Sequence, residues 1–157
     1  MVEKRTPQAQ FDKQATHCDG QWNMWTEESL KWLVEHGRFA PSNRVLDVAT
    51  GTGLTALAVA PLVAKVPGLD VSSGMLNEAR RRAAGTGITN VEFHQGSAEA
   101  VPFPDASFDA VTCRMAAHHF DSVPAFLVES ARVLVPGGRL LVADTTPPDN
   151  APEIDEW

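Results

Sequence analysis

The sequence contains no tyrosine and only two cysteines among its 157 residues. Cys18 and Cys113 lie far apart and lack the spacing of a metal-ligand pair, so we expect free thiols in a reducing compartment. No apolar run approaches the roughly 20 residues that a membrane-spanning helix needs. The first ten residues also lack the apolar stretch of a signal peptide. These absences predict a cytoplasmic protein with no membrane span.

Basic residues are scarce: 13 Lys and Arg stand against 20 Asp and Glu, which gives a formal net charge of −7. Nucleic acid is held mainly by clustered Lys and Arg side chains. The densest basic run, 80–82, is typical of a solvated face of an exposed helix. The composition therefore predicts no nucleic-acid partner.

Apolar runs that favour strands alternate with stretches that favour helices. Such alternation requires crossover connections, which produce a parallel sheet with helices on both faces. The predicted strands are 44–50, 65–71, 90–96, 108–115 and 139–145, and the predicted helices are 54–65, 72–87 and 121–138. We expect a single domain over residues 1–157, with a core at 41–146, an N-terminal helical lid segment at 1–40 and a truncated tail at 147–157.

The segment ahead of the first strand predicts an amphipathic helix over 26–37, with Thr26 as its N-cap and Gly37 past its end. Trp22, Trp25 and Trp32 give this segment a heavy aromatic load. These rings can pack the helix onto the flank of the sheet. Alternatively, the helix forms a lid over a ligand site.

The stretch VLDVATGTG, residues 45–53, joins a buried strand to a glycine turn. Ligands of open α/β sheets bind beyond the carboxyl ends of the strands, and Gly51 and Gly53 lie at that end. Glycine adopts positive φ and lets the backbone approach a ligand closely. Asp70 ends the next strand, 17 residues after Gly53, near the roughly 20-residue spacing typical of a carboxylate that binds ribose hydroxyls. The pattern predicts an adenosine ligand.

The glycine turn alone leaves the kind of adenosine ligand open. GTGLTA, residues 51–56, also fits the pattern of dinucleotide-binding turns. Asp47 discriminates, because a carboxylate repels a pyrophosphate and attracts a ligand that carries an ammonium and a sulfonium. It therefore favours S-adenosylmethionine. The alternative for Asp47 is a structural carboxylate bound to backbone amides of the loop.

Four stretches in order resemble the motifs of the class I S-adenosylmethionine-dependent methyltransferases. They are VLDVATGTG (45–53), GLDVSSGML (68–76), GSAEAVPFPDASFDAV (96–111) and RVLVPGGRLLVAD (132–144). The resemblance runs from about Phe11 to Asp144 and is strongest with the small-molecule group that includes the ubiquinone/menaquinone biosynthesis C-methyltransferases. It implies a Rossmann-like, doubly wound, mostly parallel sheet. It also implies methyl transfer from S-adenosylmethionine to a small acceptor, aromatic or quinone-like.

The resemblance also implies which residues bind the cofactor. Ser97 stands where the family commonly has Asp, so it accepts from the adenine amine without a charge. The cradle of the methionine end would be Asp47, Ala49, Gly51, Thr52 and Gly53, with Cys113 and Arg114 beside it; Asp70 would hold the ribose, Val71 and Met75 would flank the adenine, and Ser97 and Ala98 would recognise its edge.

The stretch MAAHHFD, residues 115–121, follows the fourth predicted strand and carries two histidines. His119 or His118 can act as a base that takes a proton from the acceptor, or can orient it. The alternative is a purely structural role. No third ligand is evident nearby, so the pair does not predict a metal site. In the resemblance, Phe11 and His17 belong to a segment that caps the cofactor, and Cys18 replaces a usual Tyr.

Two features depart from the family pattern. Pro67 falls inside the second predicted strand, where it removes a ladder donor. Two further strands expected after the fifth are apparently absent, which would leave an exposed edge and favour a homodimer. Two alternatives therefore stand beside the methyltransferase: a non-catalytic or truncated S-adenosylmethionine-binding module, and an NAD-dependent oxidoreductase, which Asp47 disfavours.

Overall fold

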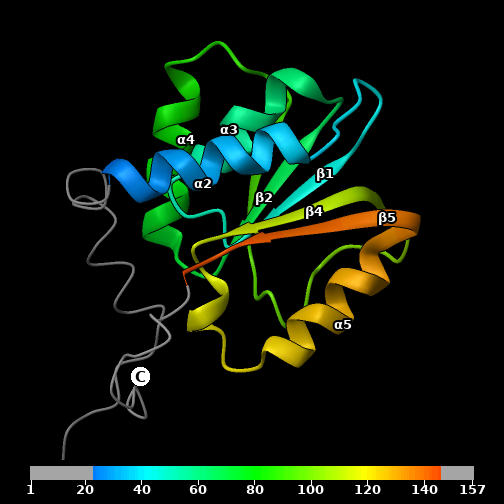
Figure 1. Cartoon of the computed structure of the whole chain (residues 1–157). Helices are drawn as coiled ribbons and strands as arrows, with labels where there is room; N and C mark the ends of the chain where they lie inside the picture. Colours follow the sequence, from blue (N-terminus) through cyan, green and yellow to red (C-terminus); the bar gives the residue numbers. More distant parts are fainter. Residues whose placement is uncertain (1–22, 146–157) are drawn as a thin grey trace, which may run out of the picture.

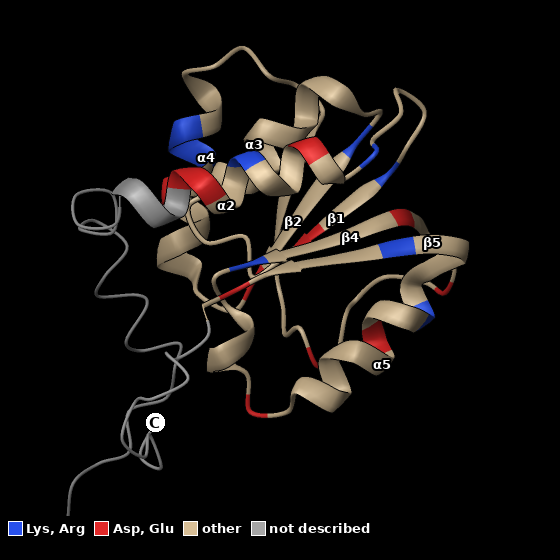
Figure 2. Ribbon diagram, in the orientation of Figure 1, with Lys and Arg blue, Asp and Glu red and all other residues tan. Residues whose placement is uncertain are grey.

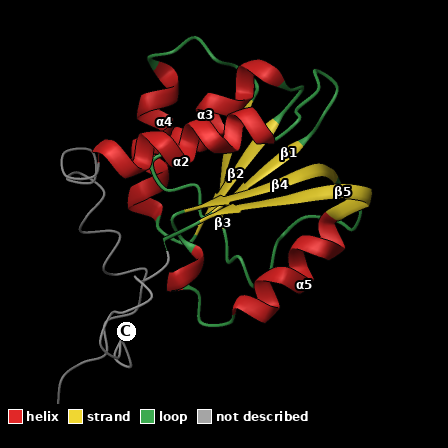
Figure 3. Cartoon of the chain, viewed as in Figure 1, coloured by secondary structure: helices red, strands yellow, loops and turns green. Residues whose placement is uncertain are grey.

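A computed structural model describes the backbone of residues 23–145 and the side chains of residues 27–145. The expectations for Phe11, His17 and Cys18, and for the 147–157 tail, lie outside the described residues. The described part forms one sheet enclosed by helices (Figures 1 and 3).

The sheet has five described strands in the order β3-β2-β1-β4-β5, and every pairing between neighbours is parallel. The chain moves outward from β1 to β2 and β3, then returns to lay β4 on the other side of β1. This reversal places a topological switch point between β1 and β4. The strands are β1 Val45–Val48, β2 Val66–Asp70, β3 Val91–Gln95, β4 Phe108–Arg114 and β5 Leu134–Ala143.

Helices cover both faces of the sheet, as predicted (Figures 1 and 3). One face carries α2 Asn23–His36, α3 Leu54–Val59 with its short extension η1 Ala60–Leu62, and α4 Ser73–Ala84. The other face carries α5 Val123–Val133. Two separate apolar cores result, with Leu33 of α2 fully buried in one and Phe126 of α5 buried in the other. The doubly wound α/β architecture is therefore confirmed.

Serine caps begin two of the helices. Ser72 Oγ accepts from the Met75 N–H at the start of α4, and Ser122 Oγ accepts from the Ala125 N–H at the start of α5. The predicted end of α5 at residue 138 is wrong, because the helix ends at Val133 and β5 begins at once. The Pro-Gly-Gly turn lies inside β5, where the register with β4 shifts and the backbone bulges.

Pro67 lies within β2, between two neighbouring strands. It is in register with Glu92 of β3. On the β1 side, the paired positions are Arg44 with Lys65 and then Asp47 with Gly68, so this ladder is interrupted beside Pro67. The absence of an N–H on proline accounts for the interruption. The sheet therefore tolerates Pro67 without a register shift in β2.

The N-terminal helix packs against the core through an aliphatic side chain. Leu33 has no exposed surface, whereas Trp32 is 46% exposed and its ring stacks on His36 with centroids 4.8 Å apart. The prediction that Trp32 fastens this helix to the sheet is therefore wrong. The helix also begins at Asn23, before the predicted cap Thr26, and ends before Gly37 as predicted.

The edge strands, the helix lengths and the positions of the basic residues bear on a second chain, a membrane and nucleic acid as partners. Within the described residues, β3 and β5 are the edge strands of the sheet; pairing of the β5 edge with a second chain stays a prediction. None of the helices between residues 23 and 145 is long and apolar enough to cross a bilayer. Lys and Arg are spread over several elements (Figure 2).

Candidate cofactor-binding and active site

The glycine turn follows β1 at the switch point. Ala49, Gly51 and Gly53 all have positive φ, at 52°, 55° and 83°. A Cβ atom on Gly51 would meet nothing within 4 Å, whereas one on Gly53 would come within 3.0–3.1 Å of Phe93 and Ala79. The bare backbone at Gly51 thus borders open space that a ligand can enter. Gly53 serves close packing instead.

Ala49 holds a conformation that non-glycine residues rarely adopt. We expect Ala49→Gly to raise the free energy of unfolding by about 1 kcal/mol, because glycine reaches positive φ without the clash of a Cβ atom. Urea denaturation followed by circular dichroism measures this change.

The control is Ala58→Gly within α3, which continues into η1. Glycine there should lower the free energy of unfolding by roughly 1 kcal/mol. If Ala49→Gly destabilises the protein to the same extent, the positive φ of Ala49 costs nothing.

Asp47 lies in the centre of the sheet and is 1% exposed. Its two carboxylate oxygens accept hydrogen bonds from the hydroxyls of Thr50, at 2.6 Å, and Thr112 of β4, at 2.7 Å. Burial raises the pKa of Asp47 to about 6, although the two hydroxyls and the charge of Arg114 oppose the increase. The structure therefore gives Asp47 hydroxyl partners instead of loop amides, and the carboxylate joins the glycine turn to β4.

Asp70 ends β2 and connects the two turns of the site. Its Oδ2 accepts from the Gly51 N–H at 2.8 Å, and its Oδ1 accepts from the Ser72 N–H at 2.9 Å. The carboxylate therefore joins the glycine turn after β1 to the turn that begins α4. The sequence predicts this carboxylate from its spacing, but not its hold on the Gly51 amide.

The expected adenine residues lie on the loops after β2 and β3 and at the start of α4. The Val71 carbonyl accepts from Gln95 Nε2 at 3.0 Å, and Met75 is buried. Ser97 Oγ accepts from the Glu99 N–H at 3.1 Å. The Ala98 side chain belongs to the apolar core on the α5 face, so only its backbone is available to an adenine edge.

A network absent from the sequence predictions fixes the loop that carries Ser97. Glu99 Oε1 accepts from the Ser122 N–H, and Glu129 Oε2 accepts from the Val101 N–H, both at 2.7 Å. Arg132 donates to Glu129 and to the Val101 carbonyl, and it lowers the pKa of Glu129 to about 2. From the sequence, the i,i+3 spacing of Glu129 and Arg132 indicates only an ion pair on the surface of α5, and not their contacts with the loop.

Cys113 and Arg114 end β4 and differ in their surroundings. Cys113 is fully buried in the apolar core, and burial raises the pKa of its thiol. Only its backbone can therefore border a ligand. The Arg114 guanidinium donates to Thr55 Oγ1 at 2.9 Å and to Ser29 Oγ at 3.2 Å, which joins β4 to α3 and α2. The N-terminal helix is thus fastened beside Asp47.

Both histidines lie in the short turn η2 Ala117–His119, directly after β4. The His118 Nδ1 lies 2.6 Å from Asp144 Oδ1, and the His118 N–H donates to Asp144 Oδ2 at 3.1 Å. The two imidazole rings are tilted, with centroids 3.9 Å apart. Burial, and then the neighbouring His118, lower the pKa of His119. Asp144 closes the fourth motif, yet the sequence analysis assigns it no role.

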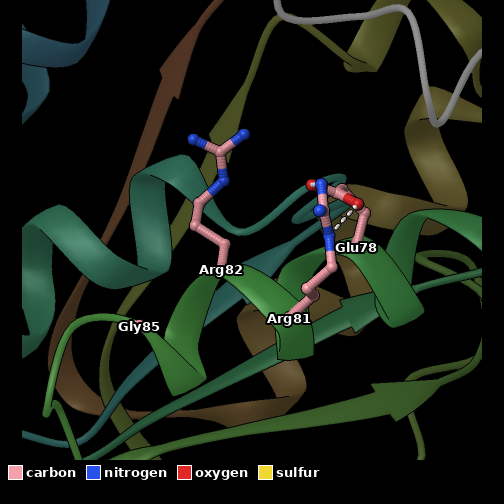
Figure 4. A pocket seen from close by; sticks show the side chains of 4 residues that line it. All are labelled: Glu78, Arg81, Arg82 and Gly85. Carbon is pink, nitrogen blue, oxygen red and sulfur yellow. Dashed lines mark hydrogen bonds and ion pairs between the residues drawn. The ribbon is translucent and has the colours of Figure 1, made fainter.

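Two further observations concern other ligands. Within residues 27–145, no group of three or more His, Cys, Asp or Glu side chains is arranged to hold a metal ion. A surface pocket on α4 is lined by Glu78, Arg81, Arg82 and Gly85, with Arg81 paired to Glu78 at 2.6 Å (Figure 4). Its lining residues lie in the second half of α4 and at Gly85, which follows the helix.

The parallel sheet, the glycine turn at the switch point and the two carboxylates define an α/β protein with a nucleoside-type ligand site. The profile of the methyltransferase domain family matches residues 46–142, more than half of the chain. The chain therefore belongs to this methyltransferase family. Family and fold imply S-adenosylmethionine as the cofactor.

Individual relatives agree with this assignment. The chain is 43% identical over 130 residues to the uncharacterized methyltransferase YcgJ of Bacillus subtilis, covering 83% of this chain and 51% of the relative. It is 39% identical over 150 residues to a demethylmenaquinone methyltransferase of Symbiobacterium thermophilum, covering 88% and 58%. The chain thus spans about half the length of the curated relatives it matches.

Solved structures confirm the fold. The crystal structure of YcgJ matches with a TM-score of 0.76 at 43% identity, over 79% of this chain and 53% of that one. An S-adenosylmethionine-dependent methyltransferase from Aquifex aeolicus matches with a TM-score of 0.77 at 26% identity, over 92% of this chain and 79% of that one. The described elements therefore form a methyltransferase fold.

Proposed function

We propose that this chain transfers a methyl group from S-adenosylmethionine to a small aromatic or quinone-like acceptor. The observation that carries the proposal is the pair of buried carboxylates, Asp47 and Asp70, on either side of an open glycine turn. When bound, the cofactor supplies a methyl group on a sulfonium, from which a neutral thioether is a good leaving group.

The two carboxylates bind different parts of the cofactor. Asp70, whose carboxylate holds the amides of Gly51 and Ser72, accepts from the ribose hydroxyls. Asp47 attracts the ammonium and sulfonium through a medium of low polarity, where a charge acts strongly. A ribose-binding carboxylate at Asp70 would suit a dinucleotide equally well, but the Asp47 carboxylate repels a pyrophosphate. The cradle thus favours S-adenosylmethionine over a dinucleotide.

The loops at the carboxyl ends of the strands bind the adenine and the methionine end of the cofactor. Val71 and Met75 flank the adenine, and Ser97 with the Ala98 backbone meets its edge. Thr52 and the backbone at Cys113 line the methionine end, which Arg114 closes by holding α2 in place. The network of Glu129 and Arg132 keeps the adenine loop in position before a ligand arrives, which lowers the entropy cost of binding.

The acceptor side lies at the carboxyl ends of β4 and β5, where His118 and His119 follow the strand. Methyl transfer is an in-line displacement, so the chain mainly aligns the reacting atoms and excludes water. A histidine base is needed only when the acceptor must lose a proton. The quinone-like acceptor class is supported by the relatives named demethylmenaquinone methyltransferase and ubiquinone/menaquinone biosynthesis C-methyltransferase.

The direct test is calorimetric titration of this chain with S-adenosylhomocysteine, with NADH as the control. We expect binding of the first ligand alone, because Asp47 repels a pyrophosphate. Screening of phenols and quinones for methylation then follows. Binding without turnover would favour the non-catalytic module, and binding of NADH alone would favour the oxidoreductase.

A further inference from the structure

We propose that Asp144 is a positioning residue that selects His118, not His119, as the base of the methyl transfer. This inference rests on the proposed function and deepens it, because a base restricts the acceptors to those that give up a proton. A base of this kind indicates that the acceptor is a phenol, a hydroquinone or a related compound with an acidic O–H or C–H group.

The contact between Asp144 and His118 is made twice. One carboxylate oxygen lies 2.6 Å from the imidazole Nδ1, and the other accepts from the backbone N–H of the same histidine at 3.1 Å. The carboxylate also accepts from the Thr145 N–H at 2.8 Å. Three contacts therefore fix the carboxylate, and the carboxylate fixes the ring.

The geometry determines which ring nitrogen carries the proton. A carboxylate can only accept, so the short contact requires a proton on Nδ1 of His118. In the neutral ring this leaves Nε2 as a lone-pair acceptor. A carboxylate behind a histidine also stabilises the imidazolium that forms when the ring takes a proton. His118 is thus prepared to act as a base through Nε2.

The elements that carry this pair converge on the cofactor edge of the sheet. His118 follows β4 and Asp144 follows β5, both at the carboxyl ends, and the Met115 N–H donates to the Ala143 carbonyl at 2.7 Å to hold the two ends together. Met115 has a φ of 54°. Positive φ recurs at Ala49 after β1, so the backbone turns sharply at both strands of the switch point, as is common at functional sites.

His119 has a different environment. Burial and the adjacent His118 lower its pKa, and the rings lie 3.9 Å apart. The Asp144 side chain makes its short contact with His118 instead. The side chain of His118 is 41% exposed, so a small acceptor can reach its ring. The ring of His119 packs against the ring of His118, and the short contact with Asp144 distinguishes His118 from it.

The proposed step moves one proton and one methyl group. The acceptor O–H or C–H gives its proton to His118 Nε2, the acceptor's electron pair forms the bond to the methyl carbon, and the carbon–sulfur bond breaks with its electrons on sulfur. With S-adenosylmethionine bound, its sulfonium would leave as a neutral thioether, and the Asp144 carboxylate would hold the imidazolium. Solvent removes the proton from the exposed ring before the next cycle.

The first test uses nitrogen NMR of the histidine side chains in the ligand-free protein, which needs no acceptor. For the neutral form of the His118 ring, we expect the proton on Nδ1 in the wild type and a shift toward the Nε2-protonated tautomer in Asp144→Asn. The amide can donate to Nδ1 in that variant. Wild-type His118 protonated on Nε2 would overturn the proposal.

The second test compares two phenols as probes under the same conditions: phenol, which is protonated at the assay pH, and 4-nitrophenol, which is ionised. Asp144→Asn and His118→Ala should each lower kcat for phenol by roughly 100-fold. Turnover of 4-nitrophenol should change by less than about threefold. Added imidazole should restore phenol methylation by His118→Ala.

The matched control is Asp121→Asn, an exposed carboxylate on the same loop, which should behave as the wild type with both phenols. S-adenosylhomocysteine affinity should be unchanged in Asp144→Asn. If that ligand fails to bind the wild type, the proposed function fails. If it binds and Asp144→Asn slows both phenols equally, Asp144 is structural and this inference alone fails.

Discussion

We expect Asp70→Ala to lower the affinity for S-adenosylhomocysteine by 100-fold or more. Two hydrogen bonds to a charged acceptor contribute about 1.5–3 kcal/mol each, and every 1.4 kcal/mol corresponds to about tenfold in affinity. The variant also leaves the Gly51 and Ser72 amides without their acceptor. The turn that cradles the ligand therefore loosens at the same time. Isothermal titration calorimetry measures the affinity.

Two variants separate these effects. Asp70→Asn keeps one carbonyl oxygen and should lose roughly tenfold in affinity, since the charge is gone but an acceptor remains. Asp109→Ala removes a carboxylate that accepts from the Arg44 N–H at 2.7 Å, a contact of the same kind at the amino end of β4. It should bind like the wild type. Equal losses in Asp70→Ala and Asp109→Ala would trace the effect to general destabilisation.

The parts of the site visible in the sequence are those that depend on local spacing. A buried strand, a glycine turn and a carboxylate on the next strand occupy fixed intervals, because the parallel sheet brings consecutive carboxyl ends to one edge. The Ser72 and Ser122 caps are likewise local, since each hydroxyl meets an amide three residues on. These features needed no knowledge of tertiary contacts.

The parts that the sequence could not supply depend on pairings between distant residues. Asp144 meets His118 across 26 positions, and Arg114 meets Ser29 across 85. The end of α5 was also missed, because the pairing of Leu134 with Phe108 starts β5 before the Pro-Gly-Gly turn. In each case a side chain or strand acquires its partner only when the sheet order is known.

The misjudged role of Trp32 has the same cause. Helical spacing places Trp32 and Leu33 on adjacent faces, and composition alone favours the larger ring as the buried one. The structure buries Leu33 instead, because its side chain meets the core formed by α3 and the sheet. Burial of a helix depends on which stripe faces the neighbour, and only the tertiary structure determines that stripe.

Asp47→Asn should raise stability and lower cofactor affinity together. Burial raises the pKa of Asp47 from 3.8 to about 6, so the folded protein holds a carboxylate that is costly to ionise. At pH 8 the neutral amide should increase the free energy of unfolding by up to about 3 kcal/mol. The Thr112 hydroxyl lies 3.5 Å from the Leu46 carbonyl and can turn toward it when it accepts from the amide. Urea denaturation at several pH values measures the change.

The sign of the pH dependence follows from the direction of this pKa change. The folded state binds the Asp47 proton more tightly than the unfolded state, so this residue favours folding most below pH 3.8. That contribution is lost as the pH rises through about 6. The difference between wild type and Asp47→Asn should therefore be small near pH 4 and grow toward pH 7. An unchanged difference across this range would mean that Asp47 is not the titrating group.

The affinity of Asp47→Asn for S-adenosylmethionine tests whether the Asp47 charge serves cofactor binding. If Asp47 attracts the ammonium and sulfonium, Asp47→Asn should weaken S-adenosylmethionine roughly tenfold. Methylthioadenosine keeps the adenosine but carries neither charge, so its affinity should not change. The exposed control Asp121→Asn should alter neither stability nor binding. Equal weakening of both ligands would instead assign Asp47 to the shape of the turn, through its hydrogen bonds to Thr50 and Thr112.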